Sequence, residues 1–214
     1  MKNQRTALTE LFTVAAATFM GISAQGAITI NFGAADLRLA GGTDFVPVNG
    51  LVIIEASTLD STFNAPTPSG FVSGDDIEIA RGSVNPAGQL TLAANGLTLS
   101  GNWTTGDPLQ IEWFPSLTIG ATAPPAGTSY GAFRTDTVQA QSPGDTSAIA
   151  WVTPADGGTY SLSFITASQG GPNLDSTGYA NLIVAVPEPS VCAMAFGLLC
   201  MTGAAIRQWR KKCV

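Results

Sequence analysis

The sequence has no histidine, and its three cysteines, Cys192, Cys200 and Cys213, all lie near the C-terminus. Residues 27–190 therefore lack the side chains of Ser-His-Asp and Cys-His catalysis and of the usual zinc sites. They also cannot form a disulfide, so packing must stabilise them. Phosphate-binding G-x-x-x-x-G-K-S/T loops are absent as well. We therefore expect no metal, no cofactor and no enzymatic activity.

Basic residues are scarce in the same segment. Between residues 27 and 190 they are Arg38, Arg81 and Arg134, against fourteen acidic residues, which gives a net charge of −11. A surface of this sign repels nucleic acids and anionic lipids, so we expect no nucleic-acid partner. It suits cations or neutral sugars as partners, and it would equally keep an exported protein soluble.

The first 26 residues have the three parts of a secretory signal peptide. Lys2 and Arg5 supply the positive start, residues 11–22 form an apolar segment, and small residues at 24–26 fit a cleavage site. The apolar segment is too short to span a membrane. We expect cleavage after Gly26 or Ala27.

The C-terminal tail, residues 186–214, places a proline motif, an apolar segment and a basic cluster in that order. Pro187 and Pro189 keep the chain extended ahead of the apolar residues 191–206. As a transmembrane helix this segment would be about 24 Å long, and basic side chains at its end would help it span a membrane core of about 30 Å. By the positive-inside rule the C-terminus stays in the cytoplasm and residues 27–185 lie outside. The basic cluster consists of Arg207, Arg210, Lys211 and Lys212.

This order resembles the PEP-CTERM sorting signal of exported bacterial proteins, in which a Pro-Glu-Pro motif precedes a membrane helix and a basic cluster. Pro187, Glu188 and Pro189 match the motif. The resemblance implies that a membrane-embedded exosortase recognises the tail and cleaves near the motif. The protein would then be released to the cell surface or to an extracellular polysaccharide matrix. An ordinary single-pass anchor with a proline stalk is the alternative.

Residues 27–185 show the pattern of one all-β domain. Short segments of alternating apolar and polar residues recur between turn signals, and none of them sustains a helical period. We predict an antiparallel β-sandwich or a barrel-like domain. The expected strands are 27–32, 37–39, 45–48, 51–56, 77–81, 89–93, 97–100, 109–114, 131–134, 148–152, 159–165 and 180–186.

Three turn sequences predict how some of these strands are joined. Asn49-Gly50 and Asn95-Gly96 are typical of type I′ hairpins. The segment 154–158 is expected to connect two more strands in the same way. Two longer polar stretches, 59–74 and 116–129, are expected to be loops.

Three tryptophans are candidates for sugar binding. Trp103, Trp113 and Trp151 could stack on sugar rings if they project from one face, although such residues in a β-domain more often belong to the core. A structural or adhesive role of a surface protein is our first interpretation of the function. Binding of extracellular polysaccharide is the second.

Two groups of carboxylates are candidates for chemistry. Glu112 lies between apolar residues of a strand, and such neighbours can raise a carboxyl pKa toward that of a general acid in glycoside hydrolysis. Strand alternation points it to the opposite face from Trp113, where a solvated side chain is the simpler expectation. Asp75, Asp76 and Glu78 offer oxygen ligands for calcium but lack the spacing of a dedicated loop. A turn leading into an edge strand explains these three residues better.

Overall fold

The structure is a computed structural model that describes residues 26–135 and 150–186. The predicted signal peptide, the Pro-Glu-Pro motif, the predicted membrane helix 191–206 and the basic cluster lie outside these residues. Within the described ranges, no helix has the length and apolar character needed to cross a membrane.

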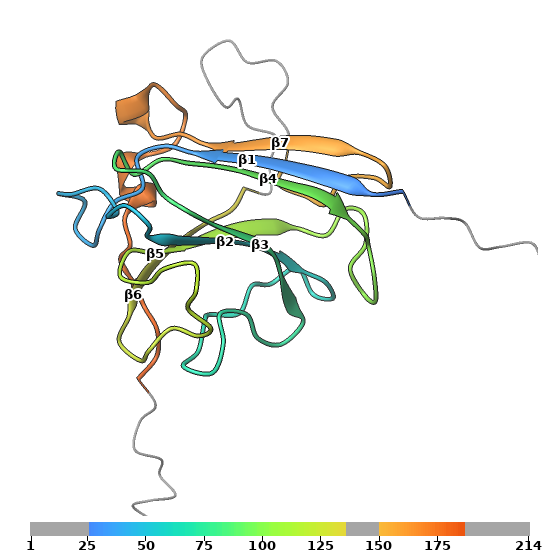
Figure 1. The fold of residues 1–214 in the computed structure, drawn as a ribbon, viewed down its shortest axis with the longest axis horizontal. Coiled ribbons are helices and arrows are strands. Elements are labelled where there is room, and N and C mark those ends of the chain that lie inside the picture. The colour runs from blue at the N-terminus through green and yellow to red at the C-terminus, as the bar shows by residue number, and fades with distance from the viewer. Residues whose placement is uncertain (1–25, 136–149, 187–214) are drawn as a thin grey trace, which may run out of the picture.

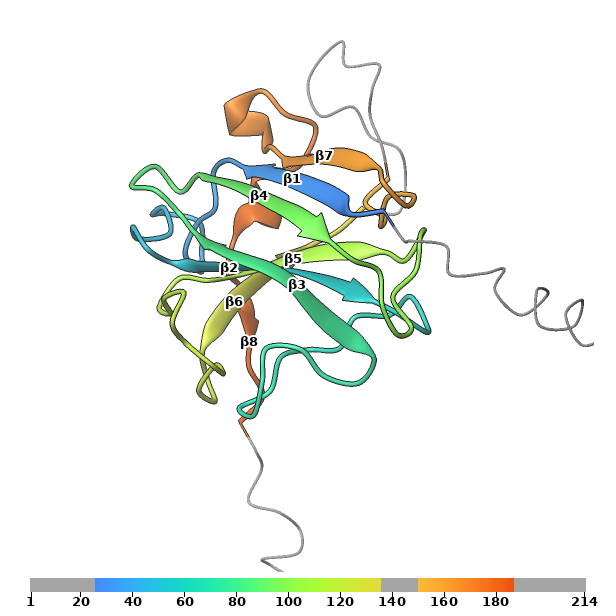
Figure 2. The same ribbon diagram turned by 45° about the vertical axis from the view of Figure 1, so that its right-hand side comes forward.

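The described part of the chain is all-β, as predicted, and its strands form two sheets that lie one above the other (Figures 1 and 2). Two short 3-10 helices, η2 (Ala167–Gln169) and η3 (Asp175–Gly178), follow the last long strand. The strands are β1 (Ile28–Ala34), β2 (Leu51–Ser57), β3 (Asp76–Ser83), β4 (Leu90–Leu97), β5 (Leu109–Phe114), β6 (Ser129–Phe133), β7 (Thr159–Phe164) and β8 (Leu182–Ile183).

The strand order is β4-β1-β7 in one sheet and β3-β2-β5-β6-β8 in the other. All neighbours are antiparallel except β1 and β7, which pair in parallel from Thr29 with Thr159 to Ala34 with Phe164. The prediction of purely antiparallel pairs is therefore wrong for β7. Because β1 and β7 lie at opposite ends of the domain sequence, no hairpin constrains their direction.

The main core lies between the two sheets. Along β1, Ile28, Ile30 and Phe32 are buried while the residues between them are partly exposed, so one face of this strand points inward. Buried residues of β2, β4, β5 and β7 complete the core from both sides. The ring of Trp151 meets the ring of Phe32 edge to face at 5.4 Å, which adds to the apolar burial.

A second apolar cluster lies on the outer face of the five-stranded sheet. It contains Leu51 and Ile53 of β2 and Phe114 of β5, covered by Phe71 and Leu117 from the two long loops. These loops, predicted at 59–74 and 116–129, lie on the side of this sheet that faces away from β1 (Figure 1). As a result all seven residues of β2 are buried, and these include Glu55, the one acidic residue of this strand.

Several predicted strands are shorter or absent in the structure. Residues 37–39, 45–48 and the described part of 148–152 contribute only isolated bridges, such as that between Arg38 and Phe45. Residues 97–100 form no strand of their own because β4 ends at Leu97. Residues 180–186 contribute only β8.

Both Asn-Gly hairpin predictions are wrong. Gly96 does have a positive φ of 68°, but it lies inside β4 in a bulge, where two residues of β4 face Thr29 of β1. Asn49 has a φ of 70° in a turn closed by the hydrogen bond from Gly50 N to Pro47 O. That turn leads into β2 without pairing it to the preceding segment. The predicted turn at 154–158 exists, but β7 after it pairs with β1.

Candidate functional site

Two glutamates lie side by side on the covered outer face of the five-stranded sheet. Glu55 of β2 pairs in register with Gln110 of β5, and Glu112 lies two residues further along β5, opposite Ile53. Residues at such diagonal positions on one face of a sheet are about 7–8 Å apart, within reach of two long side chains. The side chains of Glu55 and Glu112 are 0% and 1% exposed.

These carboxyl groups have few partners. Gln110 Nε2 donates a hydrogen bond of 2.8 Å to Glu55 Oε1. Glu55 Oε2, Glu112 Oε2 and Asp76 Oδ1 are buried and accept no hydrogen bond within the described part of the protein. Neither glutamate belongs to an ion pair of the described residues, where the two pairs are Arg38 with Asp36 and Arg81 with Glu78.

Burial therefore controls the protonation of the glutamate pair. It raises the pKa of Glu55 to about 8, an effect that the Gln110 hydrogen bond opposes and the charges of Asp76 and Glu78 increase. It raises the pKa of Glu112 to about 10, with further contributions from Glu55 and Asp76. Burial and the same glutamates raise the pKa of Tyr130 to about 12. At neutral pH the pair is held in a protonated form.

The structure corrects the expectation for Glu112 in one respect. Its side chain points to the opposite face from Trp113, as predicted, and its pKa is raised. It is not solvated, however, because the long loops cover this face of the sheet. Glycoside hydrolysis by two carboxylates requires both to reach a substrate in a cleft. Glu55 and Glu112 line none of the described pockets.

Asp36 shows how this protein stabilises a buried carboxylate that is ionised. It is 1% exposed, and its two oxygens accept bonds from Arg38 Nε at 2.7 Å, Thr166 Oγ1 at 2.7 Å and Ser168 Oγ at 2.5 Å. Burial alone would raise the pKa of Asp36. The hydrogen bonds from Ser168, Arg38 and Thr166 outweigh burial and lower it. Glu55 and Glu112 lack such a set of donors.

Of the acidic residues at 75–78, Asp75 lies in the turn before the edge strand β3, and Asp76 and Glu78 lie in β3 itself. Asp75 Oδ2 accepts hydrogen bonds from the backbone N–H groups of Thr58 at 3.1 Å and Leu59 at 2.7 Å. The Leu59 bond contributes most to lowering the pKa of Asp75. Glu78 is in an ion pair with Arg81. No group of three Asp, Glu, Cys or His residues among the described ones could hold a metal ion.

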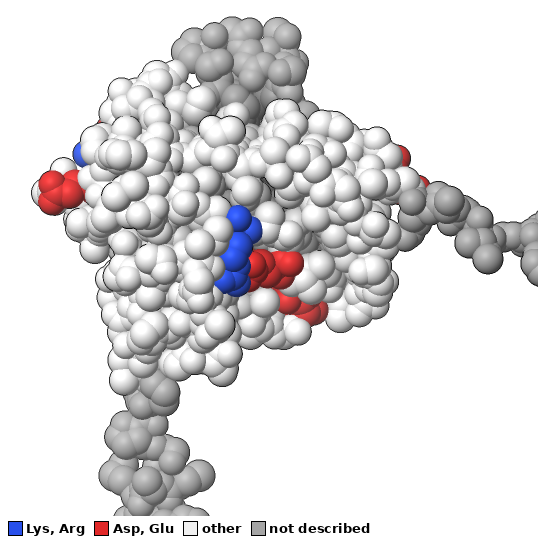
Figure 3. All heavy atoms as spheres, in the orientation of Figure 1, with Lys and Arg blue, Asp and Glu red and all other residues white. Residues whose placement is uncertain are grey.

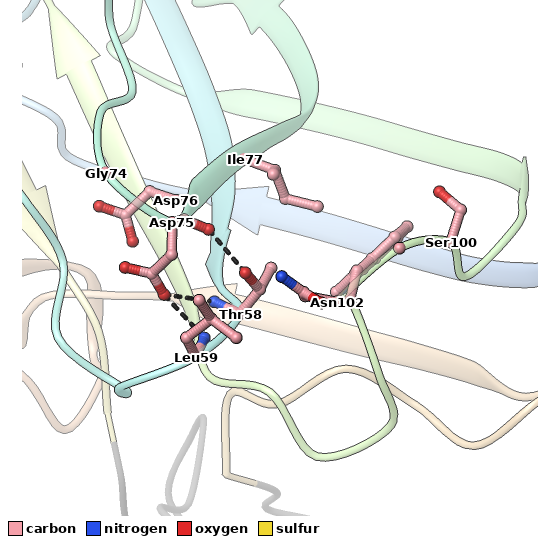
Figure 4. A pocket seen from close by; sticks show the side chains of 10 residues that line it. Thr58, Leu59, Gly74, Asp75, Asp76, Ile77, Ser100 and Asn102 are labelled. Atoms are coloured by element: carbon pink, nitrogen blue, oxygen red, sulfur yellow. Dashed lines mark hydrogen bonds between the residues drawn. The ribbon is translucent and has the colours of Figure 1, made fainter.

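A pocket of about 510 Å³, which we call the loop pocket, opens where three segments meet. They are residues 58–59 just after β2, residues 74–77 at the entry into β3, and the loop 100–103 after β4. In Figure 4, Ile77 extends from β3 toward this loop, and Asn102 and Thr58 point toward one another across the pocket. Trp103 closes the pocket on the side of the core.

The three tryptophans singled out for sugar stacking do not share an exposed face. Trp113 and Trp151 are 0% and 1% exposed and belong to the main core. Trp103 is 7% exposed, and its Nε1 donates to Thr153 Oγ1 at 2.9 Å. The hypothesis that these rings form an exposed sugar-binding platform is therefore wrong. Of the three tryptophans, Trp103 is the one that lines the loop pocket.

No family model, no curated protein and no solved structure matches the chain.

Glu55 was not among the residues that the sequence pattern singled out. The signal was present, because a lone glutamate inside LVIIEAS interrupts an apolar segment of the kind that is buried on both faces of a sheet.

Proposed function

We propose that the protein is exported, held at the membrane by residues 191–206 and sorted through a PEP-CTERM-type tail, with a structural or adhesive role at the cell surface or in the extracellular matrix. The observation that carries this proposal is the order of the Pro-Glu-Pro motif, the apolar segment and the basic cluster. In this account an exosortase is the processing partner.

The C-terminal end of the domain supports the proposal. Strand β8 is the edge of the five-stranded sheet, and both of its residues are exposed. Val186, the last described residue, is 64% exposed and directly precedes Pro187. A processing enzyme needs an extended backbone that is not covered by the domain, and proline favours such a backbone because it fixes φ and blocks helix formation.

The interior of the domain also fits an exported protein. Residues 26–135 and 150–186 contain no cysteine, and the two apolar clusters account for their packing. The fold then does not depend on the redox state of its compartment. On the face shown in Figure 3 charged side chains are few and gathered in small groups, so most of this surface is neutral.

Labelling of intact cells tests the location. Because the described residues lack cysteine, Ser161→Cys at an exposed position of β7 introduces a single thiol into the domain. A membrane-impermeant maleimide should label this variant in intact cells, with the unsubstituted chain as the control for Cys192, Cys200 and Cys213. Labelling that appears only after cell lysis would contradict export.

A further inference from the structure

The loop pocket contains polar groups whose hydrogen-bonding capacity is not used within the described protein. The side chains of Ser100 and Asn102 are exposed and form no hydrogen bond there. Asp75 is half-buried, and its Oδ2 already accepts the backbone bonds of residues 58–59 and a longer bond of 3.4 Å from Ser57 Oγ. These three side chains offer hydroxyl, amide and carboxylate atoms to a molecule in the pocket.

The pocket also has an apolar side. Ile77 packs against the main core, and Trp103 has its indole N–H bonded to Thr153, so both side chains are fixed in place. Leu59, 70% exposed, stands at the rim. A fixed apolar wall opposite a few polar groups is the usual composition of a small-molecule site, and about 510 Å³ lies within the usual range of pocket volumes.

The charge of the pocket narrows the class of ligand. Asp75 is ionised because backbone hydrogen bonds lower its pKa, and no basic residue lines the pocket. An anion would therefore meet repulsion without a compensating cation. A neutral ring with several hydroxyl groups fits better, since neighbouring hydroxyls can donate to a carboxylate and accept from an amide. The C–H face of such a ring can pack on Ile77 and Trp103.

We propose that the loop pocket binds a neutral saccharide ring through Asp75, Ser100 and Asn102, with Ile77 and Trp103 as its apolar wall. This site differs from a flat platform of several tryptophans, because the ring enters a hollow with one aromatic side chain. The proposal goes beyond the function proposed above and does not depend on export or cleavage. Either proposal can fail without affecting the other.

Nuclear magnetic resonance of the purified full-length chain in detergent micelles tests the site. The probes are glucose, galactose, mannose, maltose and cellobiose, with glucuronate as the charged comparison. The side-chain amide signal of Asn102 and the indole N–H signal of Trp103 should shift in a saturable manner with at least one neutral sugar. The indole signals of the core residues Trp113 and Trp151 should not move. Glucuronate should bind at least about tenfold more weakly than glucose if glucose binds.

Substitutions separate binding from folding. Asn102→Ala and Ser100→Ala remove side chains without described hydrogen bonds, so the melting temperature should stay unchanged while the affinity falls about tenfold or more. Asn95→Ala, at an exposed position of β4 outside the pocket, is the matched control and should bind like the unsubstituted protein.

Three results would overturn the proposal. One is the lack of a saturable shift with all the neutral sugars. Another is that the Asn102→Ala and Ser100→Ala variants bind the sugar with the same affinity as the unsubstituted protein. The third is the appearance of the same shifts with calcium chloride alone, which would identify the pocket as a cation site.

Discussion

Glu55 and Glu112 share the covered face of the five-stranded sheet at diagonal positions of the β2–β5 ladder, and both are almost fully buried. The only described hydrogen bond to either carboxyl is the one that Gln110 donates to Glu55. Two negative charges at these positions would be costly to desolvate and would repel each other. The pair is therefore compatible with the fold as long as it carries protons.

The folded protein should lose stability as the solution becomes alkaline. Both glutamates hold their protons more tightly in the folded state than in the unfolded chain, where the pKa is near 4.5. The free energy of unfolding should therefore fall as pH rises from about 4.5 through 8 toward 10. Asp36 acts in the opposite direction, because its lowered pKa gives stability that is lost below about pH 4. Denaturant titrations across this range should find the greatest stability in mildly acidic solution.

The substitution Glu112→Gln isolates the contribution of one member of the pair. Glutamine has a similar shape and no charge, so at pH 9 this variant should be about 2–4 kcal/mol more stable than the unsubstituted protein. At pH 5 the two should be similar. Asp156→Asn, at an exposed turn position, is the control and should leave the pH profile unchanged. An unchanged alkaline loss in Glu112→Gln would show that this glutamate does not cause it.

The sequence predicted the parts of the fold that depend on local pattern. Strand β5 has the predicted bounds, and β1, β2, β3 and β7 lie within two residues of theirs, because alternation is a property of neighbouring residues. Asn95-Gly96 was misinterpreted because a type I′ turn and a bulge both require a residue with positive φ. The parallel pairing of β1 with β7 depends on contacts between distant residues.

The candidate sites were harder to predict than the strands. The apolar neighbours of Glu112 indicated a raised pKa, but its burial depends on where loops 59–74 and 116–129 lie, and local periodicity does not encode this. The loop pocket combines three segments that are separate in the sequence. All three tryptophans belong to the main core, and of these three only Trp103 also lines that pocket.

Any side chain at Gly131 should lower the stability of the protein because of Trp113. The two residues face each other in the β5–β6 ladder, and a Cβ atom on Gly131 would lie 2.1 Å from Trp113 Cζ2. Since Trp113 is fixed in the core, Gly131→Ala should destabilise the protein by about 2–3 kcal/mol through overpacking. Gly120→Ala, which meets no atom within 4 Å, should change stability by less than about 0.5 kcal/mol. Equal midpoints in denaturant for the two variants would contradict the packing described.

Gly96 should resist substitution for a different reason. A Cβ atom there would meet nothing within 4 Å, so the cost comes from its φ of 68° in the β4 bulge. Gly96→Val should destabilise the protein by about 1–2 kcal/mol, because a β-branched residue is strained in this region. Ala93→Val, at an exposed position of the same strand, should be close to neutral. A thermal melt of Gly96→Val that matches the unsubstituted protein would mean that the bulge can change its geometry.

The mass of the protein recovered from a host that has an exosortase tests the central proposal most directly. If the tail is a sorting signal, the chain should be found outside the cytoplasmic membrane and shortened by roughly the 25 residues that follow Pro189. Replacing Pro187, Glu188 and Pro189 together with alanine should leave the uncleaved chain in the membrane, because the extended motif is lost. An intact C-terminus at Val214 in the unsubstituted protein, in a host shown to process other such tails, would contradict the account and leave residues 186–214 as a plain anchor.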